Sequence, residues 1–280
     1  MTSADTPSEQ HSAVVPWNGA AVVAFGNTDP GMVRESNQDN FCVDTASGLY
    51  LVADGMGGRA GGEIASSMAV ECIHSEVSAH LESLLNRDLS TRRNILAQTI
   101  NAASLKIYER SLELPQYRGM GTTATLLWIP PTQQQQQQQQ QQHGQKYSRN
   151  CIVAHVGDSR CYLLRAGLLY QITEDHSLVN EQVKAGVLKK NDPLISQMRN
   201  VITRCVGYQE EEEVDTFTLE VFENDRFLLC SDGLTNKVRD SEIARLLGQD
   251  NLAESPLELI ALANSRGGED NITVVVAHAR

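Results

Sequence analysis

Short apolar runs rich in β-branched residues recur along the chain after residue 20. Glycine, aspartate and asparagine interrupt these runs, which is typical of strands that end at turns. We therefore predict strands at 20–26, 41–44, 49–54, 123–129, 151–158, 160–167, 215–221, 225–232 and 271–279.

Two longer segments, about 63–86 and 90–112, have apolar residues at helical spacing. Shorter helices are expected at 240–247 and 256–265. Strands fill the middle of the chain and helices come in pairs. This order predicts an α+β fold in which packed antiparallel sheets are covered by helices.

Two polar segments fall outside this pattern. Residues 1–19 lack periodicity and predict a disordered tail ahead of a domain at 20–280. An unbroken glutamine run, Gln133–Gln142, separates two predicted strands. We expect a hairpin loop enlarged by insertion at about 131–149, because loop closure costs only about 0.6 kcal/mol per doubling of length.

Composition excludes several classes of protein. The net charge of −12 and the lack of a Lys/Arg block argue against nucleic-acid binding. The six cysteines form no C-x-x-C pair, so zinc-ribbon and redox motifs are absent. No signal peptide and no stretch of about 18 apolar residues is visible. We expect a cytoplasmic protein that does not bind a membrane.

Five aspartates stand at the ends of predicted strands: Asp39, Asp54, Asp158, Asp232 and Asp270. One such aspartate is usually a turn former. Five together predict one acidic rim, and neighbouring carboxylates require cations. Oxygen ligands favour Mg²⁺, Mn²⁺ or Ca²⁺ over zinc. Two such ions can activate a water and hold phosphoryl oxygens.

Six ordered motifs carry a specific resemblance. They are Arg34-Glu35-Ser36-Asn37-Gln38-Asp39, Val52-Ala53-Asp54-Gly55-Met56-Gly57-Gly58, Gly119-Met120-Gly121-Thr122-Thr123, Val156-Gly157-Asp158-Ser159-Arg160, Cys230-Ser231-Asp232-Gly233 and Asp270-Asn271. In this order they resemble the type 2C metal-dependent Ser/Thr protein phosphatases. Asp175-His176-Ser177 is similar to the bacterial-type branch. The resemblance covers about residues 20–278.

The resemblance implies a four-layer αββα sandwich with Mg²⁺ or Mn²⁺ at one end, as two core ions and a third. The implied metal ligands are Asp39, Asp54, Gly55 through its carbonyl, Asp158, Asp232 and Asp270. Asp54 would bridge the core ions, and Asp158 with Asp232 would hold the third. Arg34 would grip the substrate phosphate, since its planar fork suits two oxygens. Arg34 and Asp54 are thus the implied catalytic residues.

The implied activity is signalling dephosphorylation of phosphoserine and phosphothreonine by direct attack of a metal-bridging water. The substrate would be a phosphorylated protein that is the target of a Ser/Thr kinase. The enzyme itself would be a monomer. Residues 177–207 match the family's flap. Two departures matter: Gln38 replaces a Glu found in some members, and Met56 replaces the proposed proton-donating His of eukaryotic members. His176 is a candidate proton donor, although a structural role is the stronger interpretation.

Other phosphatase chemistries and other functions each require particular residues. No cysteine is followed six positions later by Arg, D-x-D is absent, and no P-loop occurs. A phosphatase-like binding module without catalysis would be favoured by loss of a metal aspartate, but all are present. A metal-dependent phosphoesterase acting on small molecules stays open, because sequence separates it poorly from a protein phosphatase.

Overall fold

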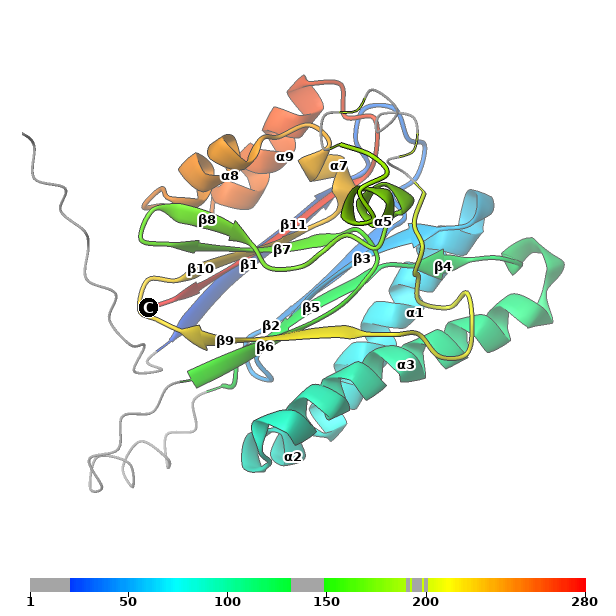
Figure 1. Ribbon diagram of the computed structural model, residues 1–280, viewed down its shortest axis with the longest axis horizontal. Helices are drawn as coiled ribbons and strands as arrows, with labels where there is room; N and C mark the ends of the chain where they lie inside the picture. Colours follow the sequence, from blue (N-terminus) through cyan, green and yellow to red (C-terminus); the bar gives the residue numbers. More distant parts are fainter. Residues whose placement is uncertain (1–20, 132–148, 190–191, 193–197, 199–200) are drawn as a thin grey trace, which may run out of the picture.

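The computed structural model describes residues 21–131, 149–189, 192, 198 and 201–280. Two antiparallel sheets lie face to face (Figure 1). The first contains, in spatial order, β1 (Val22–Asp29), β11 (Ile272–Ala279), β10 (Arg226–Cys230), β7 (Arg160–Arg165) and β8 (Leu168–Gln171). The second contains β2 (Asp39–Asp44), β3 (Leu49–Met56), β5 (Ala124–Trp128), β6 (Arg149–Val156) and β9 (Asp215–Val221), with β4 (Gly121–Thr122) paired to β3.

Helices cover the outer face of each sheet (Figure 1). The second sheet is covered by α1 (Gly58–Ala79), α2 (Leu81–Asn86) and α3 (Leu89–Glu113). The first is covered by α8 (Asp240–Leu247) and α9 (Ser255–Ser265). The described residues also form the short helices η1 (Pro115–Tyr117), α5 (Leu178–Lys184) and α7 (Asp232–Thr235). The predicted αββα sandwich is therefore confirmed.

Strand β3 illustrates why the strand sequences are continuous apolar runs. Its alternate residues Tyr50 and Val52 enter the core between the sheets, whereas Leu49, Leu51 and Ala53 enter the core beneath α1 and α3. All five are fully buried. A strand covered on both faces needs apolar side chains at every position, so the alternation expected of a half-exposed strand is lost.

The structure differs from the predicted elements at several places. The helix expected at 63–86 begins earlier, at Gly58, and breaks at His80 into α1 and α2. The periodic pattern continues through this break because Leu84 packs into the same core as the residues of α1. Strands β4 and β8 and helices α5 and α7 were not predicted, because each is too short to show periodicity.

The two predicted polar segments have different outcomes. The tail at 1–19 and the run Gln133–Gln142 lie outside the described residues. The strands on either side of the glutamine run, β5 and β6, form an antiparallel pair, as a hairpin requires. No described helix has the length and apolar character needed to span a membrane.

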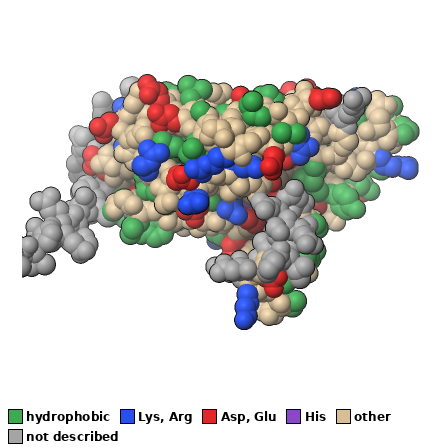
Figure 2. Space-filling view, turned by 90° about the horizontal axis from the view of Figure 1, so that it is seen from above, with side chains coloured by type: hydrophobic (Ala, Val, Ile, Leu, Met, Phe, Trp, Pro, Cys, Tyr) green, Lys and Arg blue, Asp and Glu red, His purple; other side chains and the backbone are tan. Residues whose placement is uncertain are grey.

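Charges on the α8–α9 face are mixed (Figure 2). Arg266 pairs with Glu242 at 2.5 Å, and Lys237 pairs with Glu269 at 2.9 Å. Such pairing between neighbours offsets part of the positive charge that Lys and Arg bring to this face.

Candidate metal centre

Both sheets contribute aspartates to one rim of the sandwich, next to α7. Asp39 begins β2 and pairs in register with Asp54 near the end of β3. Asp158 follows β6, Asp232 begins α7 directly after β10, and Asp270 precedes β11. A cavity of about 630 Å³ opens here, lined in part by Arg34, Asp54, Gly55, Asp158, Asp232 and Asp270. The structure thus brings together every predicted site residue except Asp39, which lies below the cavity floor.

Backbone hydrogen bonds fix the position of Asp54. Its amide donates to Thr123 Oγ1 at 2.9 Å, and its carbonyl accepts from the Thr123 amide at 2.8 Å and from Thr122 Oγ1 at 2.9 Å. At the next residue, Gly55, a Cβ would lie 2.0 Å from the carbonyl oxygen of Gly62. Only glycine allows this approach between β3 and α1, which explains the glycines of the Asp54-Gly55 motif.

Asp39 is buried beneath the rim. Its Oδ2 accepts hydrogen bonds from Ser231 Oγ and Thr273 Oγ1, both at 2.7 Å. Its Oδ1 is buried and has no hydrogen-bond partner among the described residues. Buried polar atoms are normally satisfied, so this free oxygen fits an ion or an ion-bound water. The residues present therefore suit a hard divalent cation.

Electrostatics at the rim point in the same direction. Burial, and then the charge of Asp232, raises the pKa of Asp158 to about 8. Burial, and then the charge of Asp270, raises the pKa of Asp232 to about 6. Burial and four neighbouring carboxylates raise the pKa of Asp54 well above its usual range. Burial also raises the pKa of Asp39 to about 6 despite its two hydroxyl donors. A bound cation would reverse these shifts.

The carboxylates do not yet converge on a point. No three His, Cys, Asp or Glu side chains within the described ranges are close enough to enclose an ion as they stand. Mutual repulsion separates them, and Asp270 Oδ2 turns to accept from Arg34 Nη2 at 2.7 Å. The described side chains alone therefore do not form a closed ligand set in this arrangement.

Arg34 lines the cavity with a side chain that is 52% exposed. Its loop is held by Asn271, whose amide donates to the carbonyls of Pro30 and Ser36 at 2.9 Å and accepts from the Gln38 amide at 2.8 Å. Gln38 turns its own side chain to the Gly58 carbonyl at 2.9 Å. Arg34 is thus placed for an anion in the cavity, and Gln38 has a positioning role.

Several residues that build the site were not predicted from the sequence. The hydroxyls of Ser231, Thr273 and Thr123, and the amide of Asn271, are all hydrogen-bonded to a predicted site residue or its loop. Three of them lie inside the motifs quoted above, and Thr273 lies two residues beyond the Asp270-Asn271 motif. Their position next to a candidate ligand was the available signal.

An αββα sandwich with a carboxylate rim and an arginine facing the same open cavity defines a metal-dependent phosphoester hydrolase. The family model for protein phosphatase 2C matches residues 33–255. The serine/threonine phosphatase stp of Listeria monocytogenes is 36% identical over 253 residues, which cover 89% of this chain and 92% of the relative.

Solved structures agree. The serine/threonine phosphatase of S. agalactiae superposes with a TM-score of 0.78 at 35% identity, covering 92% of this chain and 100% of the other. The catalytic domain of the phosphatase PstP, in complex with 2 manganese ions, gives a TM-score of 0.74 at 32% identity over 92% and 97%. The chain belongs to the protein phosphatase 2C family of divalent-metal-dependent enzymes.

Proposed function

We propose that this enzyme hydrolyses phosphoserine and phosphothreonine in protein substrates at the cavity beside α7. The family and its named relatives are serine/threonine phosphatases. The observation that carries the proposal is the union, in one open cavity of about 630 Å³, of aspartates from both sheets with Arg34. An open, polar cavity admits a phosphorylated side chain that projects from a protein surface.

Asp54, Asp232, Asp270 and the Gly55 carbonyl would hold a core pair of Mg²⁺ or Mn²⁺ ions. Asp39 would hold an ion or its water through Oδ1, and Asp158 with Asp232 would hold a third ion. When bound, the ions supply an activated water and neutralise charge on the phosphoryl group. In-line attack by that water needs no covalent phosphoenzyme.

The side chains of the protein have separate tasks in this reaction. Arg34 binds phosphate oxygens, and to do so it exchanges its present partner, Asp270, for the substrate. Thr122 and Thr123 hold the Asp54 backbone so that the ligand does not reorganise during the reaction. Met56 lines the cavity but carries no proton to donate. Protonation of the leaving group is therefore assigned to water near Asp158.

We further propose that the enzyme acts as a monomer on the targets of a Ser/Thr kinase, in signalling within the cytoplasm. All six cysteines are free thiols, which supports a reducing compartment. Phosphoprotein substrates follow from the family.

The test is phosphate release from a phosphothreonine peptide after chelator treatment, with and without added Mn²⁺. We expect activity only with the metal, and loss of activity in Asp54→Asn. Free phosphoserine and a nucleoside monophosphate serve as small-molecule controls. Hydrolysis of these controls in preference to the peptide would favour the phosphoesterase alternative. Metal binding without hydrolysis of any of them would favour the binding module.

A further inference from the structure

The turn that carries Asp158 is held at its Gly157 end by His176. The His176 amide donates to the Gly157 carbonyl at 2.7 Å, and the Gly157 amide donates back to ring atom Nδ1 of His176 at 3.1 Å. At the other end of the turn, Ser159 Oγ lies 2.8 Å from Thr123 Oγ1, and the Ser159 carbonyl accepts from Thr125 Oγ1 at 3.1 Å. Gly157 has φ +113°, and a Cβ there would lie 2.5 Å from Thr123 Cγ2. The Gly157 end of the turn therefore has no side chain of its own and depends on His176 for its orientation.

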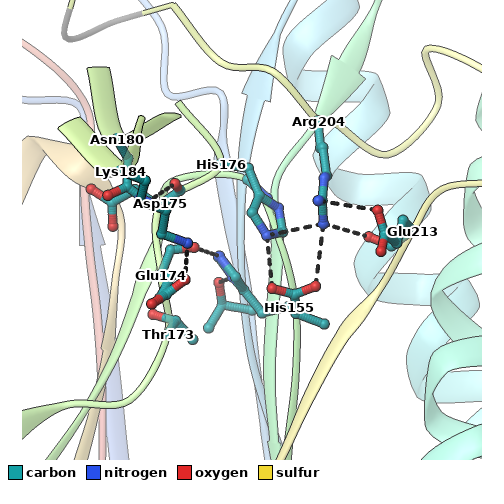
Figure 3. Close-up of polar contacts among 12 residues, drawn as sticks. His155, Thr173, Glu174, Asp175, His176, Asn180, Lys184, Arg204 and Glu213 are labelled. Atoms are coloured by element: carbon teal, nitrogen blue, oxygen red, sulfur yellow. Dashed lines mark hydrogen bonds and ion pairs between the residues drawn. The ribbon is translucent and has the colours of Figure 1, made fainter. Parts of the chain in front are cut away.

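The bonding pattern determines the state of the His176 ring. Because Nδ1 accepts from an amide, the proton is on Nε2, which donates to Asp215 Oδ2 at 3.2 Å. Arg204 Nη1 donates to the other Asp215 oxygen, also at 3.2 Å, and Arg204 pairs with Glu213 at 3.1 Å (Figure 3). Burial lowers the pKa of His176, which keeps the ring neutral and this tautomer in place.

The backbone of His176 and the next two residues also tie down the base of the predicted flap. The His176 carbonyl accepts from the Thr203 amide, and the Leu178 amide donates to the Val201 carbonyl, both at 2.9 Å. Between them, Ser177 and Ile202 form an antiparallel β-bridge. Ile202 itself lines the catalytic cavity. The wall of the cavity and the Asp158 turn thus share His176 as a common support.

A purely structural role is the competing explanation, and His155 shows what that role looks like. Its ring packs against that of His176 at 4.8 Å between centroids and contacts Thr125 Oγ1 and the Glu174 carbonyl. These two bonds use both ring nitrogens of His155. Asp215, by contrast, is about one-third exposed, so its bond to the His176 ring adds little to the core.

We infer that His176 is a positioning residue of this enzyme, which orients the Gly157–Asp158 turn through Nδ1 and is itself oriented by Asp215 and Arg204. The inference rests on the proposed function, because Asp158 matters only if it holds an ion. It assigns His176 no proton transfer to substrate, in contrast to the candidate role considered from the sequence.

Two isosteric variants separate the two ends of the ring. His176→Asn places an amide oxygen near Nδ1 and keeps the acceptor for Gly157, but loses Asp215. His176→Gln places an amide near Nε2 and keeps the donor to Asp215, but leaves the Gly157 amide unpaired. Removing a group that orients a metal ligand typically costs 10–100-fold in metal affinity or activity.

The measurements are Mn²⁺ calorimetry on the full chain, kcat and KM for a phosphothreonine peptide, and the thermal midpoint. In His176→Gln we expect the weakest Mn²⁺ site to lose about 10-fold or more in affinity, with kcat falling and KM little changed. His176→Asn should stay close to wild type in both. His176→Gln should also lose more thermal stability, because it leaves the buried Gly157 amide unpaired, so affinity and kcat are compared per folded molecule.

Equal effects of the two variants on Mn²⁺ affinity and kcat, or a larger effect of His176→Asn, would overturn the inference. If His176→Gln does not fold, His176→Phe replaces it, because a phenyl ring fills the place of the imidazole but offers the Gly157 amide no acceptor. A weakest Mn²⁺ site that is unchanged in His176→Phe would then overturn the inference. Wild-type enzyme is measured alongside the variants to separate the role of His176 from the proposed function. If the wild-type enzyme released no phosphate, the proposed function would be refuted and not the role of His176.

Discussion

The buried carboxylate of Asp225 and the buried carboxylates of the rim have opposite surroundings. Asp225, whose side chain is 1% exposed, accepts from Arg165 Nε at 2.8 Å and from Nη2 at 2.6 Å, and also from the Phe222 amide at 2.7 Å. At the rim, Asp39, Asp54 and Asp158 accept no hydrogen bond from any described Lys or Arg side chain, and burial raises the pKa of each.

The difference teaches how to tell a structural carboxylate from a functional one. A buried charge is costly unless it is paired. Asp225 carries its counter-charge within the fold, so that region is complete. At the rim, Arg34 pairs with Asp270, but the remaining aspartates outnumber the nearby cations and repel one another. An arrangement of this kind is stable only when a cation from solution supplies what the sequence omits.

The largest expected effect separates the two sets directly. Asp54→Asn should lower kcat by at least about 100-fold, because even residues that only orient a metal ligand commonly cost 10–100-fold. It should leave the free energy of unfolding of the metal-free protein unchanged or higher, since it removes repulsion. Peptide turnover and denaturant unfolding check both effects.

Asp225→Asn is the matched control. It should lower the free energy of unfolding by about 1–3 kcal/mol, because the Arg165 pair is weakened. Activity per folded molecule should be retained. If Asp225→Asn abolished catalysis, or Asp54→Asn destabilised the metal-free protein as strongly, the distinction between the two sets would be wrong.

The next effect concerns Asp158, which would hold the third ion. Asp158→Ala should keep the core ions and the fold but slow turnover of a phosphothreonine peptide by about 10–100-fold. p-Nitrophenyl phosphate should suffer less, because its leaving group needs no protonation. Metal occupancy by calorimetry, alongside rates on both substrates, tests this division. Equal slowing of both substrates would contradict it.

Arg34 lines the cavity, so substitutions of Arg34 test whether its planar guanidinium binds the substrate phosphate. Arg34→Ala should reduce kcat/KM by about 10–100-fold, corresponding to one charge-assisted hydrogen bond of about 1.5–3 kcal/mol. Arg34→Lys should recover only part of this, because a point charge lacks the planar fork. Full activity of both variants would remove Arg34 from the phosphate site.

The smallest effect is on the pH dependence of stability. Carboxyls whose pKa is higher in the folded chain bind more protons when folded, so the metal-free protein should lose stability as pH rises. Between pH 6.5 and 8.5 the decline should come mainly from Asp158, whose pKa is raised to about 8. Asp158→Ala should flatten the decline, and saturating Mn²⁺ should abolish it. A rising stability over this range in metal-free wild type would contradict the account.

The sequence predicted the parts of the site that depend on position along strands. Asp54, Asp158 and Asp232 follow apolar runs, and the ends of antiparallel strands place them at one rim. It could not predict the ring of His176 against Asp215, because those residues are separated by 39 positions and meet only through the register of β9.

The basic flap residues are a second case. Lys184 and Arg204 both lie in the predicted flap and make it basic in sequence, but Lys184 pairs with Glu174, and Arg204 with Asp215 and Glu213. Charge counted along a sequence does not reveal which charges are paired across space. The short helix α5 and the turns around it, which make these pairs, have no periodicity to read.

The central claim is that the buried aspartates of the rim bind divalent cations. The most direct test is Mn²⁺ calorimetry on chelator-treated wild-type protein at pH 7.5, repeated in two buffers of different ionisation enthalpy. The account predicts binding of at least two ions with release of protons, because raised pKa values leave rim carboxyls partly protonated before the metal enters. Phosphatase activity should appear in step with occupancy. No Mn²⁺ binding, or full activity in the metal-free protein, would contradict the account.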